Sequence, residues 1–207
     1  MYKLYWCPET ASSVVMAALE EAGAAYELHL VDTREKQHKT PEYLAINPCG
    51  LVPALALPDG RTIFESAAMI MEICDRHPKA RLAPPPGDPD RPVFYQWMLY
   101  MADTLYPDYR RYFYADRYST DPADAPRIRA KAMEDLLTDW KVIDDALAGR
   151  EWLVGGRLGG ADLYMETMVT WFDPMEALFA RYGNIARVAG AVAARPAVIK
   201  AAARHRR

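Results

Sequence analysis

Three side chains that can donate a proton or act as a nucleophile lie within residues 7–12. Cys7 follows a short aromatic segment, Thr10 comes next, and Ser12 begins a segment with helical periodicity. An ionised cysteine can exchange disulfides. A hydroxyl near a helix N-terminus can stabilise an anion together with the partial positive charge of the helix. Capping of the helix is an equally good interpretation for each hydroxyl.

A second polar pair, Glu65 and Ser66, lies where a predicted strand ends and a predicted helix begins. The first N–H groups of a helix have no partner within the helix and carry a partial positive charge, so a carboxylate can bind there. In isolation, a simple helix cap explains the pair better. Residues 47–53, Asn-Pro-Cys-Gly-Leu-Val-Pro, precede the pair and end a short predicted helix.

The elements that position these residues alternate in type over the first 80 residues. Strands are predicted from apolar and aromatic alternation, and helices from their periodicity and stop signals. The predicted strands are Lys3–Trp6, Tyr26–Val31, Pro53–Leu57 and Arg61–Phe64, and the predicted helices are Ser12–Ala22, Thr40–Ile46 and Ser66–Arg76. A β-α-β crossover makes the first two strands parallel and a hairpin adds antiparallel ones, so we expect a four-stranded mixed sheet.

The composition changes after residue 80. Residues 81–90 are rich in proline and form a stiff connector, whereas residues 91–207 are helical almost throughout, with breaks at prolines and glycines. We therefore predict an α/β domain over residues 1–80, a linker over 81–90 and an all-α domain over 91–207. The basic end, residues 204–207, is expected to be a solvated tail.

Aromatic residues crowd the first part of the helical region. Tyr106, Tyr109 and Phe113 are three and four residues apart, so they share one helical face. Such a stripe is more often part of a core, but buried tyrosine hydroxyls need polar partners. We expect these residues to line a cleft beside the α/β domain that admits a flat or aromatic molecule.

The composition excludes several classes of function. Apolar residues make up 51% of the chain and charged residues 26%, and the net charge is −3. This composition is globular and gives no general attraction to nucleic acid or anionic membranes. No apolar run approaches the roughly 20 residues of a membrane span, and the start has no signal-peptide layout. Cys7, Cys49 and Cys74 lack disulfide or metal-ligand spacing, so we expect a cytoplasmic protein without a metal site.

Four motifs, taken in order, resemble the cytosolic glutathione transferase family over essentially the whole chain. They are residues 4–8 (LYWCP), 47–55 (NPCGLVPAL), 64–70 (FESAAMI) and the Ala161-Asp162 pair within 154–163. The second and third motifs together are the most specific, and residues 39–48 resemble the beta-like bacterial branch. The resemblance implies a thioredoxin-like βαβ-α-ββα domain followed by a helical bundle. It also implies glutathione as co-substrate, no other cofactor, and a homodimer.

The resemblance assigns glutathione-binding roles to particular positions. Lys39 would reach the glycyl carboxylate. Leu51, Val52 and Pro53 belong to a turn in which the Val52–Pro53 bond is expected to be cis. This turn would present the N–H and C=O of Val52 to the cysteinyl unit, as if glutathione were an added strand.

The same resemblance gives roles to three further polar residues. Ser66 would hold the α-carboxylate of the γ-glutamyl end, and Glu65 its ammonium group. Asp103 would reach the glutathione of the partner subunit, and a solvated acid on a helix face is an equal alternative.

Both chemical residues of the beta class are replaced in this chain. The class cysteine corresponds to Ala11 and the class histidine to Tyr106. Hydroxyl groups are the remaining candidates to donate a hydrogen bond to the glutathione sulfur, and we place Ser12 slightly ahead of Thr10 in this role. Cys7 is the alternative, as the site of a mixed disulfide with glutathione, although a partly buried strand-end cysteine explains it better.

The sequence therefore predicts a glutathione transferase that activates the glutathione thiolate for attack on a hydrophobic electrophile. Two alternatives stay open. One is a glutathione-dependent disulfide or peroxide reductase, through Cys7 or through glutathione alone, and the other is a non-catalytic glutathione- or ligand-binding protein. Asp162 is expected to accept from the N–H of Gly159, although glycine replaces the usual hydroxyl cap.

Overall fold

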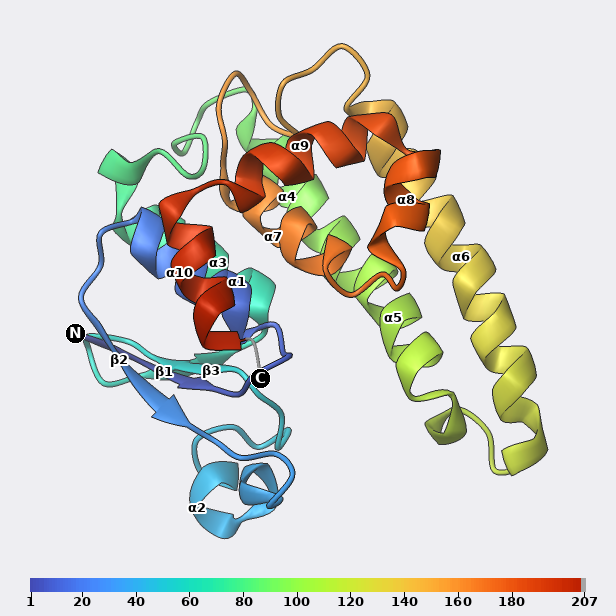
Figure 1. The fold of residues 1–207 in the computed structure, drawn as a ribbon. Helices are drawn as coiled ribbons and strands as arrows, with labels where there is room; N and C mark the ends of the chain where they lie inside the picture. The colour runs from blue at the N-terminus through green and yellow to red at the C-terminus, as the bar shows by residue number, and fades with distance from the viewer. Residues whose placement is uncertain (206–207) are drawn as a thin grey trace.

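The computed structural model describes residues 1–205 and has a sheet-containing N-terminal half and a helical C-terminal half (Figure 1). The sheet has four strands in the order β2-β1-β3-β4. They are β1 (Tyr2–Trp6), β2 (Tyr26–Leu30), β3 (Ala54–Ala56) and β4 (Thr62–Phe64). β1 and β2 are parallel, and the β3–β4 hairpin is antiparallel. The predicted mixed sheet is therefore confirmed.

Two helices cover one face of this sheet and a short one lies beyond the other (Figure 1). α1 (Ser12–Glu21) and α3 (Ser66–Arg76) pack against each other on the first face. α2 (Pro41–Leu44) is capped by Thr40, whose hydroxyl accepts from the N–H of Tyr43. This βαβ-α-ββα order is the thioredoxin-like arrangement expected from the sequence.

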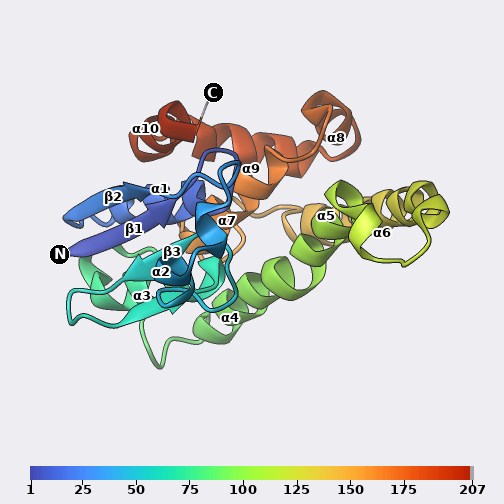
Figure 2. The same cartoon turned by 90° about the horizontal axis from the view of Figure 1, so that it is seen from below.

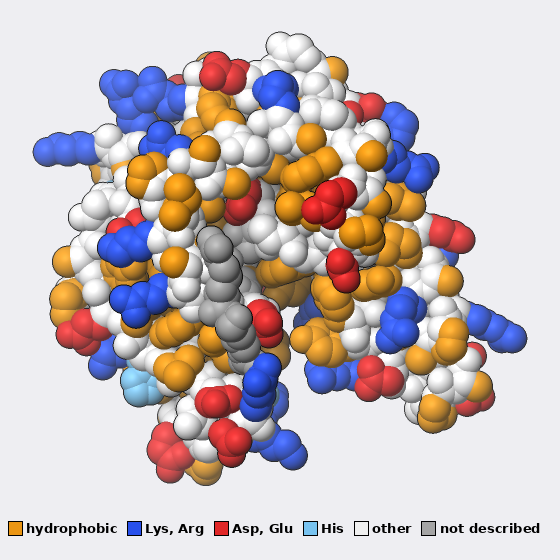
Figure 3. All heavy atoms as spheres, viewed as in Figure 1, with side chains coloured by type: hydrophobic (Ala, Val, Ile, Leu, Met, Phe, Trp, Pro, Cys, Tyr) orange, Lys and Arg blue, Asp and Glu red, His pale blue; other side chains and the backbone are white. Residues whose placement is uncertain are grey.

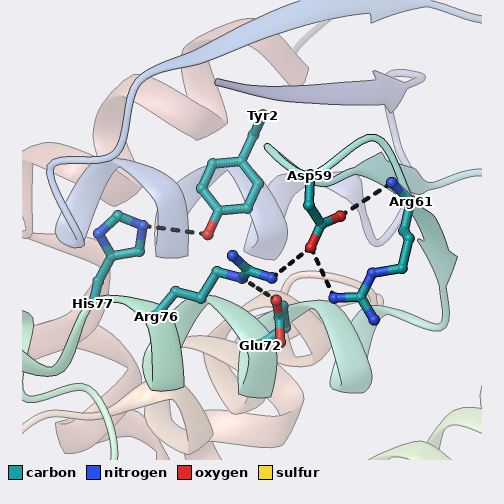
Figure 4. Close-up of polar contacts among 6 residues, drawn as sticks. All are labelled: Tyr2, Asp59, Arg61, Glu72, Arg76 and His77. Atoms are coloured by element: carbon teal, nitrogen blue, oxygen red, sulfur yellow. Dashed lines mark hydrogen bonds and ion pairs between the residues drawn. The ribbon is translucent and has the colours of Figure 1, made fainter.

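A polar cluster fastens the β3–β4 turn to α3 on the outside of the sheet domain (Figure 4). The Asp59 carboxylate lies 2.8 Å from a terminal nitrogen of Arg61 and 2.9 Å from one of Arg76. Hydrogen bonds from Arg61 hold the pKa of Asp59 well below its usual range. Because all three side chains are exposed, the cluster orders the turn but contributes little to stability.

The helical half contains seven α-helices within the described residues. They are α4 (Arg91–Tyr100), α5 (Tyr106–Phe113), α6 (Ala125–Ala146), α7 (Gly160–Val169), α8 (Met175–Arg181), α9 (Gly183–Ala193) and α10 (Pro196–His205). Figure 2 shows α9 and α10 on one side of the molecule and α5 with α6 extending away from the sheet. The helical prediction for this region is confirmed.

A π-helical segment, Met101–Leu105, joins α4 to α5. Pro107 follows it and has no N–H, so the carbonyl of Asp103 loses its usual donor four residues later. The N–H of Tyr106 instead bonds the carbonyl of Met101, five residues back. Such wider turns are frequent at functional sites.

Every residue of α7 is buried, so this helix forms the centre of the helical half. Asp162 accepts from the N–H of Gly159 at 2.8 Å and from that of Leu153 at 2.9 Å, which confirms the expected cap. A Cβ at Gly159 would lie 2.7 Å from the carbonyl oxygen of Leu82, and one at Gly160 would lie 2.8 Å from Ile70. Glycine replaces the hydroxyl cap because the linker and α3 approach too closely for a side chain.

The last helix, α10, returns to the N-terminal half and packs on α1 (Figures 1 and 2). Arg195 forms a bidentate ion pair with Glu21 at 2.7 and 2.8 Å, and Lys200 lies 2.6 Å from Glu20. The expectation of a solvated basic tail is wrong for His205, which is only 9% exposed. Residues 206 and 207 lie outside the described residues.

Candidate active site

The first part of the site is the turn that enters β3. The Val52–Pro53 bond is cis, as expected. Val52 precedes Ala54, the first paired residue of β3, so its backbone groups lie outside the ladder. The carbonyl of Leu51 accepts from the hydroxyl of Tyr43 and from the side-chain amide of Asn47, both at 2.7 Å. These two donors, whose role the sequence did not indicate, hold the carbonyl of Leu51 and so stabilise the turn.

Lys39 lies beside this turn and is exposed. Its ammonium group donates to the carbonyl of Gly50 at 2.8 Å. Gly50 has a φ of +57°, and a Cβ there would lie 2.9 Å from both the Lys39 nitrogen and the carbonyl oxygen of His38. Glycine is therefore required at position 50, because the backbone has a positive φ and because the Lys39 side chain and the His38 carbonyl leave no space for a Cβ.

Glu65 and Ser66 begin α3. Glu65 is exposed and has a φ of +72°. Ser66 is buried, and its Oγ lies 3.0 Å from the hydroxyl of Tyr164. Burial raises the pKa of Tyr164, so this tyrosine keeps its proton and can donate to Ser66. The Ser66 proton then remains available for an external acceptor such as a carboxylate.

Tyr164 comes from the helical half, and sequence reasoning missed it. Only its position indicated a role: Tyr164 stands two residues after Asp162, in a helix whose residues are all buried. A buried tyrosine hydroxyl needs a polar partner, and Ser66 supplies it across the boundary between the halves.

The loop between β1 and α1, together with Ser12, forms the second part of the site. The hydroxyls of Thr10 and Ser12 lie 2.7 Å apart, and both lie near the carbonyl oxygen of Cys7, at 2.8 and 3.0 Å. Ser12 is completely buried, whereas Thr10 is partly exposed. The Ser12 hydroxyl also lies 2.9 Å from Nε2 of His205. Thr10 is therefore the more accessible of the two hydroxyls.

Cys7 lies at the end of β1 and is 1% exposed. Its Sγ is 3.4 Å from the hydroxyl of Thr33. Thiol–disulfide exchange requires access to the sulfur. The geometry therefore does not support Cys7 as a redox centre, and the interpretation as a buried strand-end cysteine agrees with the structure.

Figure 3 shows a hollow between the two halves, with hydrophobic side chains on its helical side. The ring of Tyr106 meets that of Trp171 edge-on, with centroids 5.1 Å apart. Burial raises the pKa of Tyr106 to about 12, and the charge of Glu65 acts in the same direction. Tyr106 therefore remains a neutral hydroxyl.

The remaining aromatic residues of the stripe divide between core and surface. Tyr109 is 2% exposed and accepts a hydrogen bond from the indole of Trp140 at 3.1 Å, so it belongs to the core. Phe113 is 46% exposed and stacks on Tyr109. The expectation that Tyr109 lines a cleft is wrong, because its indole partner satisfies its hydroxyl within the core.

Asp103 lies on the π-helical segment and is exposed. The negative charges of Asp103 and Glu65 both raise the pKa of Tyr164.

Within residues 1–205, no group of three or more His, Cys, Asp or Glu side chains could hold a metal ion. No helix in the same range is long and apolar enough to cross a membrane. A cavity of about 670 Å³ lies between the linker and the loop before α7, lined by Leu82, Arg91 and Gly156 among others. Its lining includes none of the candidate site residues described in this subsection.

Comparisons with known proteins agree with this arrangement. Residues 10–76 match the family model described as glutathione S-transferase, N-terminal domain. The glutathione S-transferase GST-4.5 of Xanthomonas campestris is 30% identical over 169 residues, which cover 82% of this chain and 81% of that protein.

Two solved structures extend the similarity to the full length. A glutathione transferase homologue from Sulfitobacter, solved with bound glutathione, is 27% identical with a TM-score of 0.89, covering 99% of this chain and 98% of the other. The beta-class enzyme of Sphingomonas chungbukensis is 27% identical with a TM-score of 0.84, covering 98% of each chain. The chain thus belongs to the glutathione S-transferase family, with a beta-like bacterial layout and the activity of a glutathione transferase.

Proposed function

We propose that this transferase binds glutathione along an anchor, defined as Lys39, Leu51–Pro53, Glu65 and Ser66, and activates the thiol with Thr10. The observation that carries the proposal is the position of Thr10. It is the partly exposed member of a hydroxyl pair at the start of α1, and its partner Ser12 is buried. The anchor would offer complementary groups to a tripeptide: a cation, the backbone of Val52 outside the sheet ladder, and a helix start with a carboxylate and a hydroxyl.

The chemistry requires a glutathione thiolate. A free thiol titrates near pH 8.5, so lowering its pKa by about two units takes about 2.7 kcal/mol of selective stabilisation. A hydroxyl that donates to the sulfur, aided by the N-terminal charge of α1, contributes part of this energy. The thiolate then attacks the second substrate, so the nucleophile belongs to glutathione and not to the protein.

The second substrate in this proposal is a hydrophobic electrophile in the hollow between the halves. Tyr106 with Trp171, and the exposed ring of Phe113, supply aromatic surface on the helical side. Tyr106 also offers a neutral hydroxyl, which suits an electrophile with a hydrogen-bond acceptor.

The proposal includes the assembly, the location and the division of the chain. Homologous layout supports a homodimer in the cytoplasm, with Asp103 directed toward the glutathione of the partner subunit. The domains are residues 1–80 and 91–207, joined by residues 81–90, which agrees with α4 starting at Arg91.

The decisive experiment compares Thr10→Val with Thr10→Ser. The thiol pKa of bound glutathione is measured from the ultraviolet absorbance of the thiolate, and kcat is measured with an activated aryl chloride. Valine is expected to raise the thiol pKa by about one unit and to lower kcat at neutral pH about ten-fold, whereas serine retains both. An unchanged thiol pKa in Thr10→Val, with glutathione still bound, would show that Thr10 is not the donor.

A further inference from the structure

The cavity between the linker and the loop before α7 belongs to neither part of the candidate active site. Its volume of about 670 Å³ is in the range of pockets that hold drug-sized molecules. Both halves of the molecule line it, with Cys74 from α3, Phe94 from α4 and Ala161 from α7. A molecule bound there would therefore contact both halves at once.

Apolar side chains form one wall of this cavity. They include Leu82, the prolines at 84–86, Phe94 and Val154. A proline-rich segment is stiff and has few conformations to lose, so ordering it around a ligand costs little. The hydrocarbon part of a ligand would bury hydrophobic surface against this wall.

Arg91 holds the wall in place from inside the protein. It is 5% exposed, and its guanidinium donates to the carbonyl of Pro84 at 2.7 Å and to the carboxylate of Asp75 at 2.6 Å. Its guanidinium carbon lies 5.4 Å from the ring centre of Phe94. One side chain thus ties the linker to α3 and α4, and Asp75 neutralises its charge.

Two further arginines on the lining, Arg81 and Arg157, are not used in this way. Both residues are exposed. Neither guanidinium forms an ion pair or a hydrogen bond with any residue in the described part of the chain. Their donors are therefore open to a ligand in the cavity.

The acidic side chains on the lining already have positive partners within the fold. Asp75 pairs with Arg91, and Asp88 accepts from the N–H of Asp90 at 2.8 Å. Asp90 itself directly precedes the N-terminus of α4, whose partial positive charge compensates its carboxylate. The charges that remain without a partner are the two arginines, which favours an anionic ligand.

We propose that this cavity binds an amphipathic organic anion, with its hydrocarbon body against Phe94 and the prolines and its carboxylate or sulfonate held by Arg81 and Arg157. Guanidinium groups suit such anions because they can donate two parallel hydrogen bonds. The site is separate from the glutathione anchor, and the inference does not depend on Thr10 or on the thiol chemistry.

The test uses 8-anilinonaphthalene-1-sulfonate, an apolar anion whose fluorescence rises on burial, in the presence of saturating S-hexylglutathione. This conjugate would occupy the anchor and the hollow, so the remaining fluorescence reports binding elsewhere. One sulfonate molecule is expected to bind per chain. N-phenyl-1-naphthylamine, which has the same rings without the sulfonate, should bind about ten-fold more weakly or worse.

Arginine variants test the charged end of the site. Arg157→Gln and Arg81→Gln should each raise the Kd of the sulfonate about three- to ten-fold, because each removes one exposed cation. Arg150→Gln is the matched control, since Arg150 is exposed and does not line the cavity. The Kd of the control, and kcat and KM of all three variants, should stay within about two-fold of the wild type.

Amide NMR locates the bound probe. The N–H signals of Gly155 and Gly156, which line the cavity, should shift when the sulfonate is added, whereas that of Gly190 in α9 should not. Three results would overturn the inference: no sulfonate binding beside S-hexylglutathione, equal binding of the neutral probe, or an unchanged Kd in both arginine variants. Failure of S-hexylglutathione to bind would count against the anchor alone, because the arginine variants and the glycine signals still report on the cavity.

Discussion

The anchor and the β1–α1 loop lie on the same sheet domain but are built in different ways. The anchor combines the exposed charged side chains of Lys39 and Glu65 with backbone outside the sheet ladder. Most of its supporting contacts come from residues nearby in sequence, such as Tyr43 to Leu51 and Lys39 to Gly50. The loop depends on Ser12, which is buried beneath a helix that ends 193 positions later.

This difference separates the two tasks of the site. Affinity for glutathione should depend on the anchor, and ionisation of the thiol should depend on the loop. A variant in one region should leave the function of the other region nearly unchanged, and mutagenesis can test this expectation.

The largest expected effect is on the anchor. Glu65→Gln keeps the shape of the side chain but removes the charge that would hold the glutathione ammonium. Charge-assisted hydrogen bonds contribute about 1.5–3 kcal/mol, so the glutathione Kd should rise about 10- to 100-fold by calorimetry. Glu42→Gln, at an exposed position on α2, is the control. A shifted thiol pKa in the bound complex would contradict the separation of tasks.

The next effect concerns the loop. Ser12→Ala leaves Nε2 of His205 buried without its partner, and an unpaired buried polar group costs about 1–3 kcal/mol. Urea unfolding should show this loss of stability. Ser13→Ala, at a less buried position on the same helix, is the matched control. Equal stability of the two variants would mean that the hydrogen bond to His205 contributes nothing.

A third prediction tests α7, which supports both regions. Glu166 is 9% exposed, makes no hydrogen bond through its carboxyl to any described residue, and burial raises its pKa from 4.5 to about 7. The protonated form is therefore favoured by folding, so its stabilising contribution is complete below pH about 4.5 and is lost as pH rises through about 7. Between pH 5 and 8 the wild type should lose about 1–3 kcal/mol relative to Glu166→Gln.

That prediction is checked by urea unfolding of both proteins at several pH values. Parallel pH profiles would show that the Glu166 carboxyl does not titrate differently in the folded and unfolded states.

The smallest expected effect is at Cys7. Because its thiol is buried, Cys7→Ala should change conjugating activity and disulfide reductase activity by less than about two-fold. Loss of reductase activity alone would restore the redox interpretation and would place a second function in the β1–α1 loop.

Local patterns predicted most of the fold and the anchor. The bounds of α3, Ser66–Arg76, were predicted correctly because a strand, a polar cap and an apolar periodic segment follow one another directly. The cis turn and the cap by Asp162 were also expected, since each depends on neighbouring residues.

The thiol end of the site could not be predicted in the same way. Ser12 and Thr10 are both good hydroxyl donors in the sequence, and only the packing of α10 shows which one is buried. Tyr109 and Tyr106 share a helical face, but Trp140 holds Tyr109 in the core from 31 positions away. Helical periodicity predicts which residues share a face of a helix. It does not predict which residues from elsewhere in the chain pack against that face.

The continuous core has a consequence for how this protein unfolds. One cluster of buried side chains extends from Tyr2 in β1 through α3 and α7 to Ala201 in α10. Because this cluster is continuous across both halves, we expect the two halves to share one cooperative transition despite their separate folds. Loss of glutathione binding and loss of helical circular dichroism should therefore coincide during denaturation, and neither half is expected to persist when the other melts.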